Sequence, residues 1–245
     1  MMDTAIWHDV ECGSYTADLA VWETLSAEGD TVLDLGCGTG RVALHLAHRG
    51  RRVTGLDQDQ ELLTTLELRA QLEGLQVDTV CADAREFDLG VQFDVVFAPM
   101  QLAQLLHGSG ERRAMLQSAA RHLRPGGLFA TTLMDLEGEL LDDEYGPPPA
   151  DTREVDSWVY SSLSAAAHVV EHGNALRIQR LRTTVSPVGE ESESVDEVRL
   201  ELVSPDELEG EAEAGGLTLE HRRTIPATEH VACVVVAASR PRAAS

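Results

Sequence analysis

The sequence predicts an α/β fold with a doubly wound, mainly parallel sheet, and three observations support this. The apolar run at 32–35 indicates a buried strand, and the glycines directly after it lead into an amphipathic helix. Strand patterns at 53–56, 77–81 and 93–97 alternate with helical patterns. A Pro-Gly-Gly turn at 125–127 then precedes a fifth strand. Strands that alternate with helices are typical of parallel sheets.

The glycine-rich turn lies within the segment VLDLGCGTGRVALHLA, residues 32–47. Gly36 and Gly38 carry no Cβ, so a ligand can lie directly against the backbone, and the following helix start offers unpaired N–H groups. NAD-binding turns have the spacing G-x-G-x-x-G. Here the spacing is G-x-G-x-G, and Arg41 stands where the third dinucleotide glycine would fall. The turn predicts a nucleotide-type ligand and disfavours NAD, although an NAD-linked oxidoreductase is kept as an alternative.

The segment DLGCGTG resembles motif I of the class I S-adenosylmethionine (SAM) dependent methyltransferases. The resemblance implies a Rossmann-like, seven-stranded, mainly parallel sheet that ends in an antiparallel C-terminal hairpin. It also implies SAM as the cofactor and S-adenosylhomocysteine (SAH) as its product, with no metal. The cofactor contacts that it implies in this motif come from Asp34, Gly36, Cys37, Gly38 and Gly40.

Acidic residues end the next two predicted strands. Asp57 lies about twenty positions beyond the glycine turn, where a carboxylate can accept hydrogen bonds from both ribose hydroxyls, and Gln58 follows it. The alternative for Asp57 is a helix N-cap, a role that Asp59 can also fill. By resemblance, Asp83 meets the adenine amine and the Ala84 backbone lies near the ring; the alternative for Asp83 is a loop cap.

The fourth predicted strand, 93–97, is followed by a break at Pro99. Ligands of open α/β sheets lie beyond the carboxyl ends of the strands, so residues 98–101 should face the transferred methyl group. Ala98 and Met100 are therefore predicted cofactor contacts. Enzymes that methylate amino groups of DNA carry an Asp/Asn-Pro-Pro-Tyr/Phe motif here, and this chain has APMQ instead.

The rest of the chain divides around this core. Residues 1–30 are expected to form a lid consisting of a loop and a helix, and 31–135 the SAM-binding core. Residues 136–202 are predicted to be an antiparallel β insert that covers the substrate or pairs subunits, with turns at Gly173 and Gly189. Residues 203–245 should complete the core sheet, through a helix capped by Ser204 and two strands.

The sequence is least informative about proton removal. His107, shortly after the fourth strand, is the first candidate for a general base, because imidazole titrates near neutral pH. Tyr15 is the second catalytic candidate and, with Trp7 and Glu11, can line the pocket under the lid; the alternative is that Trp7 and Tyr15 only attach the lid to the core. Glu11 is also a candidate base, as are two histidines of the insert, His168 and His172.

Composition restricts the partners. The chain has 42 acidic and 19 basic residues, a net charge of −23, and no lysine. Nucleic-acid binding needs clustered positive charge, so RNA or DNA is not expected as a partner. No apolar run is long enough to span a membrane, and the four scattered cysteines suggest a reducing cytoplasm. The predicted function is methyl transfer from SAM to nitrogen or oxygen of a small-molecule acceptor, with a homodimer through the insert as a possibility. The alternatives are a protein or RNA methyltransferase and a non-catalytic SAM-binding regulator.

Overall fold

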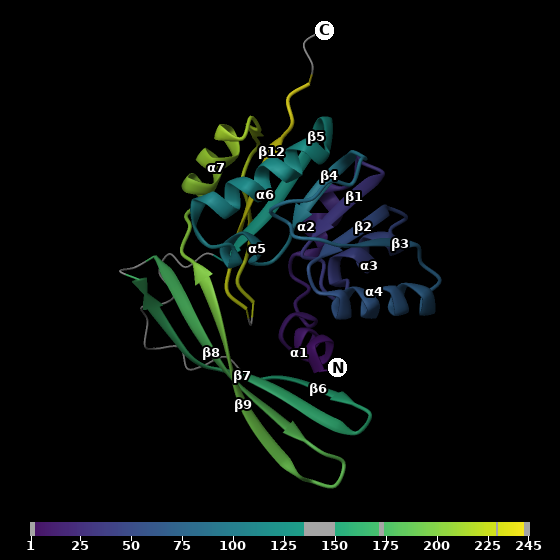
Figure 1. The fold of residues 1–245 in the computed structure, drawn as a ribbon, viewed down its shortest axis with the longest axis vertical. Coiled ribbons are helices and arrows are strands. Elements are labelled where there is room, and N and C mark those ends of the chain that lie inside the picture. Colours follow the sequence, from purple (N-terminus) through teal and green to yellow (C-terminus); the bar gives the residue numbers. More distant parts are fainter. Residues whose placement is uncertain (1–2, 135–149, 172–173, 229, 243–245) are drawn as a thin grey trace.

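The protein was studied as a computed structural model, which describes residues 3–134, 150–171, 174–228 and 230–242. It contains a central α/β sheet with helices on both faces and a separate antiparallel sheet of four strands that projects from it (Figure 1). The strands of the central sheet are β1 (Thr31–Leu35), β2 (Arg52–Asp57), β3 (Val77–Cys81), β4 (Phe93–Ala98), β5 (Leu123–Met134), β10 (Thr218–Leu219), β11 (Arg223–Ile225) and β12 (Cys233–Ser239).

The strand order of the central sheet is β10-β12-β5-β4-β1-β2-β3. The five strands from β5 to β3 are parallel, and β12 is antiparallel to β5, as predicted for the C-terminal hairpin. The sheet has eight strands rather than the predicted seven, because β10 and β11 both pair with β12. These two short strands share one position at the edge of the sheet.

Alternating side chains of the buried strands form one core on each face of the sheet. Val95 and Phe97 of β4 pack with α2 (Leu19–Leu25), α3 (Arg41–His48) and α4 (Gln60–Leu72). Val96 and Ala98 of the same strand pack with α6 (Gly108–His122) and α7 (Pro205–Ala214) on the opposite face. The short helix α5 (Leu102–Leu105) follows β4. This two-sided burial explains why the parallel strands are continuous apolar runs in the sequence.

The insert is an antiparallel sheet in the order β6-β7-β8-β9, with β6 (Asp151–Val155), β7 (Trp158–Val170), β8 (Ala175–Val185) and β9 (Glu191–Glu201). This confirms the antiparallel insert, although its three longest strands exceed the short strands that the sequence suggested. Gly189 lies in the turn before β9 with φ of 85°. The predicted turn at Gly173, and the boundary expected at 135–136, lie at or within residues that the structure does not describe.

The N-terminal helix α1 (Asp3–Cys12) corrects the loop expected over this segment. It lies between the central sheet and the insert (Figure 1). The Trp7 ring packs edge-on against Tyr160 of β7 at a centroid distance of 5.4 Å, and Arg182 of β8 donates to Glu11 at 2.8 and 2.9 Å. Because α1 contacts structure on two sides, its apolar residues do not form the single stripe by which a helix is predicted.

Two predicted helix caps are confirmed. Asp59 accepts hydrogen bonds from the backbone N–H groups of Glu61 and Leu62, at 2.8 and 3.4 Å, and so begins α4. Ser204 and Glu207 form a reciprocal capping box at the start of α7. In the part of the chain that the structure describes, no helix has the length and apolar character to cross a bilayer.

Candidate functional site

The candidate site lies at the carboxyl ends of β1, β2 and β4, around the glycine loop of residues 36–40. The backbone N–H groups of Gly36 and Cys37 donate to the carbonyl of Leu56, at 2.8 and 3.1 Å, and tie the loop to the end of β2. The three glycines have φ of 64°, 55° and 95°. These left-handed values strain any residue with a Cβ.

Two glycines of the loop also have no room for a side chain. A Cβ on Gly38 would overlap the imidazole of His8 from α1, and a Cβ on Gly40 would overlap the Leu66 side chain of α4. The G-x-G-x-G spacing is therefore required both by the left-handed backbone conformation and by the close packing of His8 and Leu66 against the loop. The Cys37 side chain is buried against Gly55 and does not face an open space.

Asp57 is fixed against this loop. Its Oδ2 accepts the backbone N–H of Gly38 at 2.9 Å, and its Oδ1 accepts that of Asp59 at 2.9 Å. The structure thus separates the two roles considered for this segment, since Asp59 caps α4 while Asp57 faces the loop. Gln58 lies between them with an exposed side chain, and its carbonyl accepts the Cys81 thiol at 3.6 Å.

Asp34 is the buried acid beneath the loop. Asp34 is 1% exposed, and among the described residues its Oδ1 has no hydrogen-bond partner. Burial raises the pKa of Asp34 to about 7, against the opposing effects of Arg41 and of a hydrogen bond from the Ala43 backbone. A buried carboxylate oxygen without a donor needs a cationic or N–H partner. The ammonium group of SAM fits this requirement, and the carboxylate of Asp57 fits its ribose hydroxyls.

This geometry predicts that the affinity for the cofactor falls at acidic pH. Binding of an ammonium group favours the ionised form of Asp34. Below about pH 7 the free protein carries a proton on Asp34, and this proton must dissociate when the cofactor binds. The affinity for SAH should fall roughly tenfold from pH 7.5 to pH 6, measured by isothermal titration calorimetry. The Asp34→Asn variant should bind more weakly and lose this dependence. A wild-type affinity that is constant over this range, or an equal slope in the variant, contradicts the assignment.

Asp83 is held by a neighbouring arginine. Arg85 donates from its backbone N–H at 2.8 Å and from Nε at 2.9 Å to Asp83 Oδ1, and it also pairs with Glu111 of α6. The hydrogen bonds from the Arg85 side chain lower the pKa of Asp83. The loop-capping role is therefore present, and the adenine contact is kept as a proposal. Ala84 packs partly buried against the core cluster on this face.

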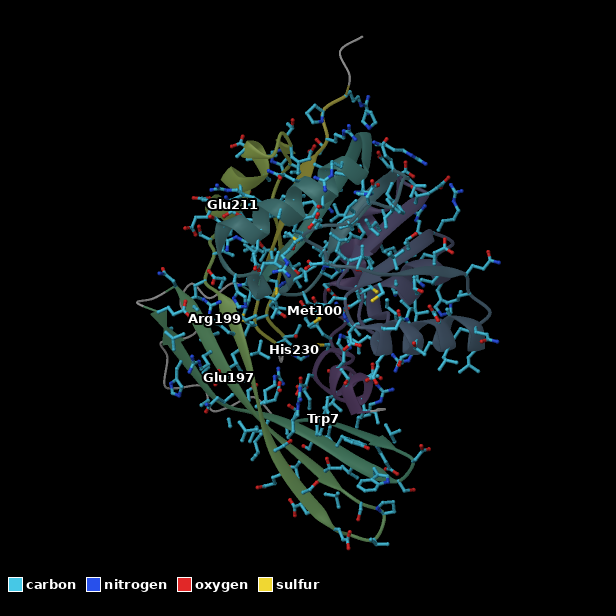
Figure 2. All side chains as sticks on the ribbon, in the orientation of Figure 1. Trp7, Met100, Glu197, Arg199, Glu211 and His230 are labelled. Atoms are coloured by element: carbon cyan, nitrogen blue, oxygen red, sulfur yellow. The ribbon has the colours of Figure 1, made fainter. Side chains whose placement is uncertain are left out.

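The end of β4 turns sharply at Met100, which has φ of 54°. The Ala98 and Met100 carbonyls accept from the hydroxyls of Thr131 and Thr132, each at 2.6 Å, and this fixes the segment to β5. The Ala98 side chain is fully buried, so a ligand at this edge would meet Met100 first. In Figure 2, Met100 and His230 are labelled between the central sheet and the insert.

The two catalytic candidates lie in different surroundings. The buried Tyr15 donates from its hydroxyl to Cys233 Sγ at 3.8 Å, and its ring meets His230 edge-on at 5.2 Å. Burial raises the pKa of Tyr15, so its phenol stays protonated at neutral pH. His107 is exposed before α6, and its Nδ1 accepts from Arg199 of β9 at 2.7 Å. The described contacts do not bring these two side chains together.

The sequence did not predict that residues of α1 contact the glycine loop. His8 covers Gly38, and Asp9 accepts the Thr39 hydroxyl at 2.7 Å and pairs with Arg69 of α4. No local pattern identifies these contacts, because a lone histidine next to an aspartate carries no signal of its own. Only the packing of α1 on the loop reveals them.

The fold is that of the Rossmann-like SAM-dependent methyltransferases. Comparisons with known proteins agree: residues 32–127 match the family model described as a methyltransferase domain. Residues 32–127 are thus similar to a methyltransferase domain, and the chain as a whole shares the fold of solved SAM-dependent methyltransferases.

Three similar proteins illustrate the match. The cypemycin N-terminal methyltransferase of a Streptomyces species is 40% identical over 100 residues, which cover 41% of this chain and 40% of that protein. The sugar N-methyltransferase KedS8 from Streptoalloteichus has a TM-score of 0.77 at 20% identity, covering 99% of this chain and 93% of that chain. The SAM-bound amino pentose methyltransferase CalS10 from Micromonospora echinaspora has a TM-score of 0.71 at 22% identity, covering 93% of each chain. Both structures show a shared fold that includes the insert. The chain spans about half the length of the curated relatives it matches.

Proposed function

We propose that the protein transfers a methyl group from SAM to a nitrogen or oxygen atom of a small-molecule acceptor. The observation that carries this proposal is the arrangement of Asp34, Gly38 and Asp57 at the ends of β1 and β2. It offers an orphaned carboxylate oxygen for an ammonium group and a fixed carboxylate for ribose hydroxyls, with the glycine loop between them. Arg41 stands where the third glycine of a dinucleotide-binding turn would fall, which disfavours NAD.

The contribution of the chain to the reaction is mainly positioning. When bound, SAM supplies a methyl group on a sulfonium centre that needs no covalent or metal activation. Asp34 and Asp57 hold the two ends of the donor, Asp83 and the Ala84 backbone meet the adenine, and Met100 faces the reacting end. Aligning the acceptor lone pair in a site with little water accounts for most of the expected rate enhancement.

The acceptor must also lose a proton, and two side chains are proposed for this stage. Arg199 donates to Nδ1 of His107, so Nε2 carries the ring proton of the neutral imidazole. His107 can therefore take a proton from the acceptor only at Nδ1, after Arg199 has moved away. Tyr15 keeps its own proton, because burial raises its pKa, and so acts by orienting the acceptor through its hydroxyl.

The names of the similar proteins and the charge of the chain support a small acceptor. The three proteins described above are, by name, a cypemycin N-terminal methyltransferase, an amino pentose methyltransferase and a sugar N-methyltransferase. A net charge of −23 without lysine disfavours a nucleic-acid substrate. A protein substrate and a non-catalytic SAM-binding role are the alternatives.

Assembly and location belong to the same proposal. The insert exposes Trp158, Val169 and Val195, apolar side chains that a second copy of the chain would cover in a homodimer. The cytoplasm is proposed because all four cysteines lie in described residues and none forms a disulfide.

The test is methyl transfer from SAM that carries an isotopically labelled methyl group. Purified protein is incubated with amino sugars, peptides with free N-termini, and phenols, and products are identified by mass spectrometry. The proposal predicts a labelled product from at least one of these classes, and none with the Asp57→Ala variant. Labelling of RNA or of protein side chains instead would contradict it.

A further inference from the structure

The helix α1 places one histidine directly on the glycine loop. The imidazole of His8 lies against Gly38 so closely that a Cβ on this glycine would overlap Nε2. Gly38 also donates its backbone N–H to Asp57 at 2.9 Å. His8 Nε2 and the Asp57 carboxylate therefore flank the same residue of the loop, from α1 and from β2.

Neighbouring hydrogen bonds select the tautomer of His8. The Thr39 hydroxyl donates its only proton to Asp9 Oδ1 at 2.7 Å, and its oxygen lies 3.3 Å from His8 Nδ1. Because the hydroxyl proton is already used, the Thr39 oxygen can only accept from His8, so Nδ1 carries the ring proton. Nε2 then presents a lone pair at Gly38.

The partners of Asp9 hold this arrangement in place. Asp9 is 7% exposed and pairs with Arg69 of α4 and, at 2.9 Å, with Arg153 of β6. Burial would raise the pKa of Asp9, but hydrogen bonds from Arg69 and Thr39 outweigh it and lower the pKa. Asp9 therefore stays ionised and keeps accepting the Thr39 proton.

His8 itself is neutral in this environment. Burial lowers the pKa of His8, and the nearby Arg41 and Arg69 add to this, while the charges of Asp9 and Asp57 oppose it. A neutral imidazole with one protonated nitrogen accepts at the other. Asp57 and His8 thus present two hydrogen-bond acceptors beside Gly38.

We propose that His8 Nε2 accepts a hydrogen bond from one ribose hydroxyl of the cofactor while Asp57 accepts from the other, and that Thr39 and Asp9 are positioning residues for His8. The proposal rests on the SAM-binding function above. A ribose is favoured over the ammonium group because His8 adjoins Gly38 and Asp57, whereas Asp34 provides the orphaned acceptor for a cation. It also assigns α1 a direct part in cofactor recognition.

The test compares the binding of SAH with that of its 2′-deoxy and 3′-deoxy analogues by isothermal titration calorimetry. Loss of one neutral hydrogen bond corresponds to roughly three- to tenfold in affinity. His8→Ala and His8→Phe should each weaken SAH binding by about this factor, and both should bind one deoxy analogue as well as wild type does. Thr39→Val should show a smaller loss with the same preference. His48→Ala, which removes a half-exposed histidine of α3 paired with Glu73, is the matched control and should bind all ligands like wild type.

The outcomes separate this proposal from the proposed function. If wild type binds no SAH, the cofactor assignment itself fails. If wild type binds SAH but the His8 variants match it, or weaken SAH and both analogues equally, the hydrogen bond from His8 is overturned. His8→Phe keeps a flat ring on Gly38, and the melting temperature of each variant, measured alongside, distinguishes loss of the contact from loss of α1 packing.

Discussion

The Asp57→Ala variant is expected to bind SAM at least about 100-fold more weakly than wild type. A hydrogen bond to a charged group contributes about 1.5–3 kcal/mol, and the ribose would lose its charged acceptor. The variant also leaves the backbone N–H groups of Gly38 and Asp59 without the partners that now lie at 2.9 Å, so the loop is less well fixed. Isothermal titration calorimetry with SAM and SAH measures the effect.

Asp59→Ala is the matched control for this prediction. It removes a carboxylate two residues away that caps α4 through Glu61 and Leu62. The expected cost is about 1 kcal/mol of folding stability, visible in the melting temperature, with nearly unchanged SAM affinity. Equal losses of affinity in the two variants would show that Asp57 acts through the local backbone and not through the ribose.

Gly38→Ala is expected to abolish measurable SAM binding at micromolar concentrations. The new Cβ would overlap His8, and the φ of 55° adds about 1–2 kcal/mol of backbone strain. The loop can relieve the overlap only by displacing α1 or by moving away from Asp57, and both changes disturb the cofactor site. Fluorescence or calorimetric titration measures the loss, and circular dichroism checks that the fold persists.

Gly50→Ala separates strain from close approach. Gly50 has φ of 80°, yet a Cβ there would meet no atom within 4 Å. This variant should lose stability through strain alone and bind SAM like wild type. If Gly38→Ala binds SAM as well as Gly50→Ala does, the close packing at the loop is not needed for cofactor binding.

The sequence predicted the part of the site that is local in the chain. The glycine spacing, the acid at 57 and the cap at 59 are separated by short distances along the chain, and each has a backbone reason that can be recognised in the sequence. The mainly parallel sheet followed from alternating strands and helices, and the capping box at Ser204 from its S-P-D-E pattern. Short-range chemistry of this kind needs no knowledge of packing.

The contacts that sequence could not predict are tertiary. His8 meets Gly38 across thirty positions of chain, and Glu11 meets Arg182 across a still larger separation. Both depend on α1, whose residues are shared between two contacting surfaces and so show no single apolar face. The surroundings of the two catalytic candidates could not be predicted for the same reason. Only packing shows that Tyr15 is buried beside His230 and that His107 accepts a hydrogen bond from Arg199.

The glycine loop is expected to bind SAM, and titration of the purified wild-type chain with SAM, SAH and NAD is the decisive measurement. SAM and SAH should bind with dissociation constants in the micromolar range, and NAD should not bind. Binding of NAD in their place, or binding of none of the three, would contradict the assignment of Asp34, Gly38 and Asp57 and the function built on them.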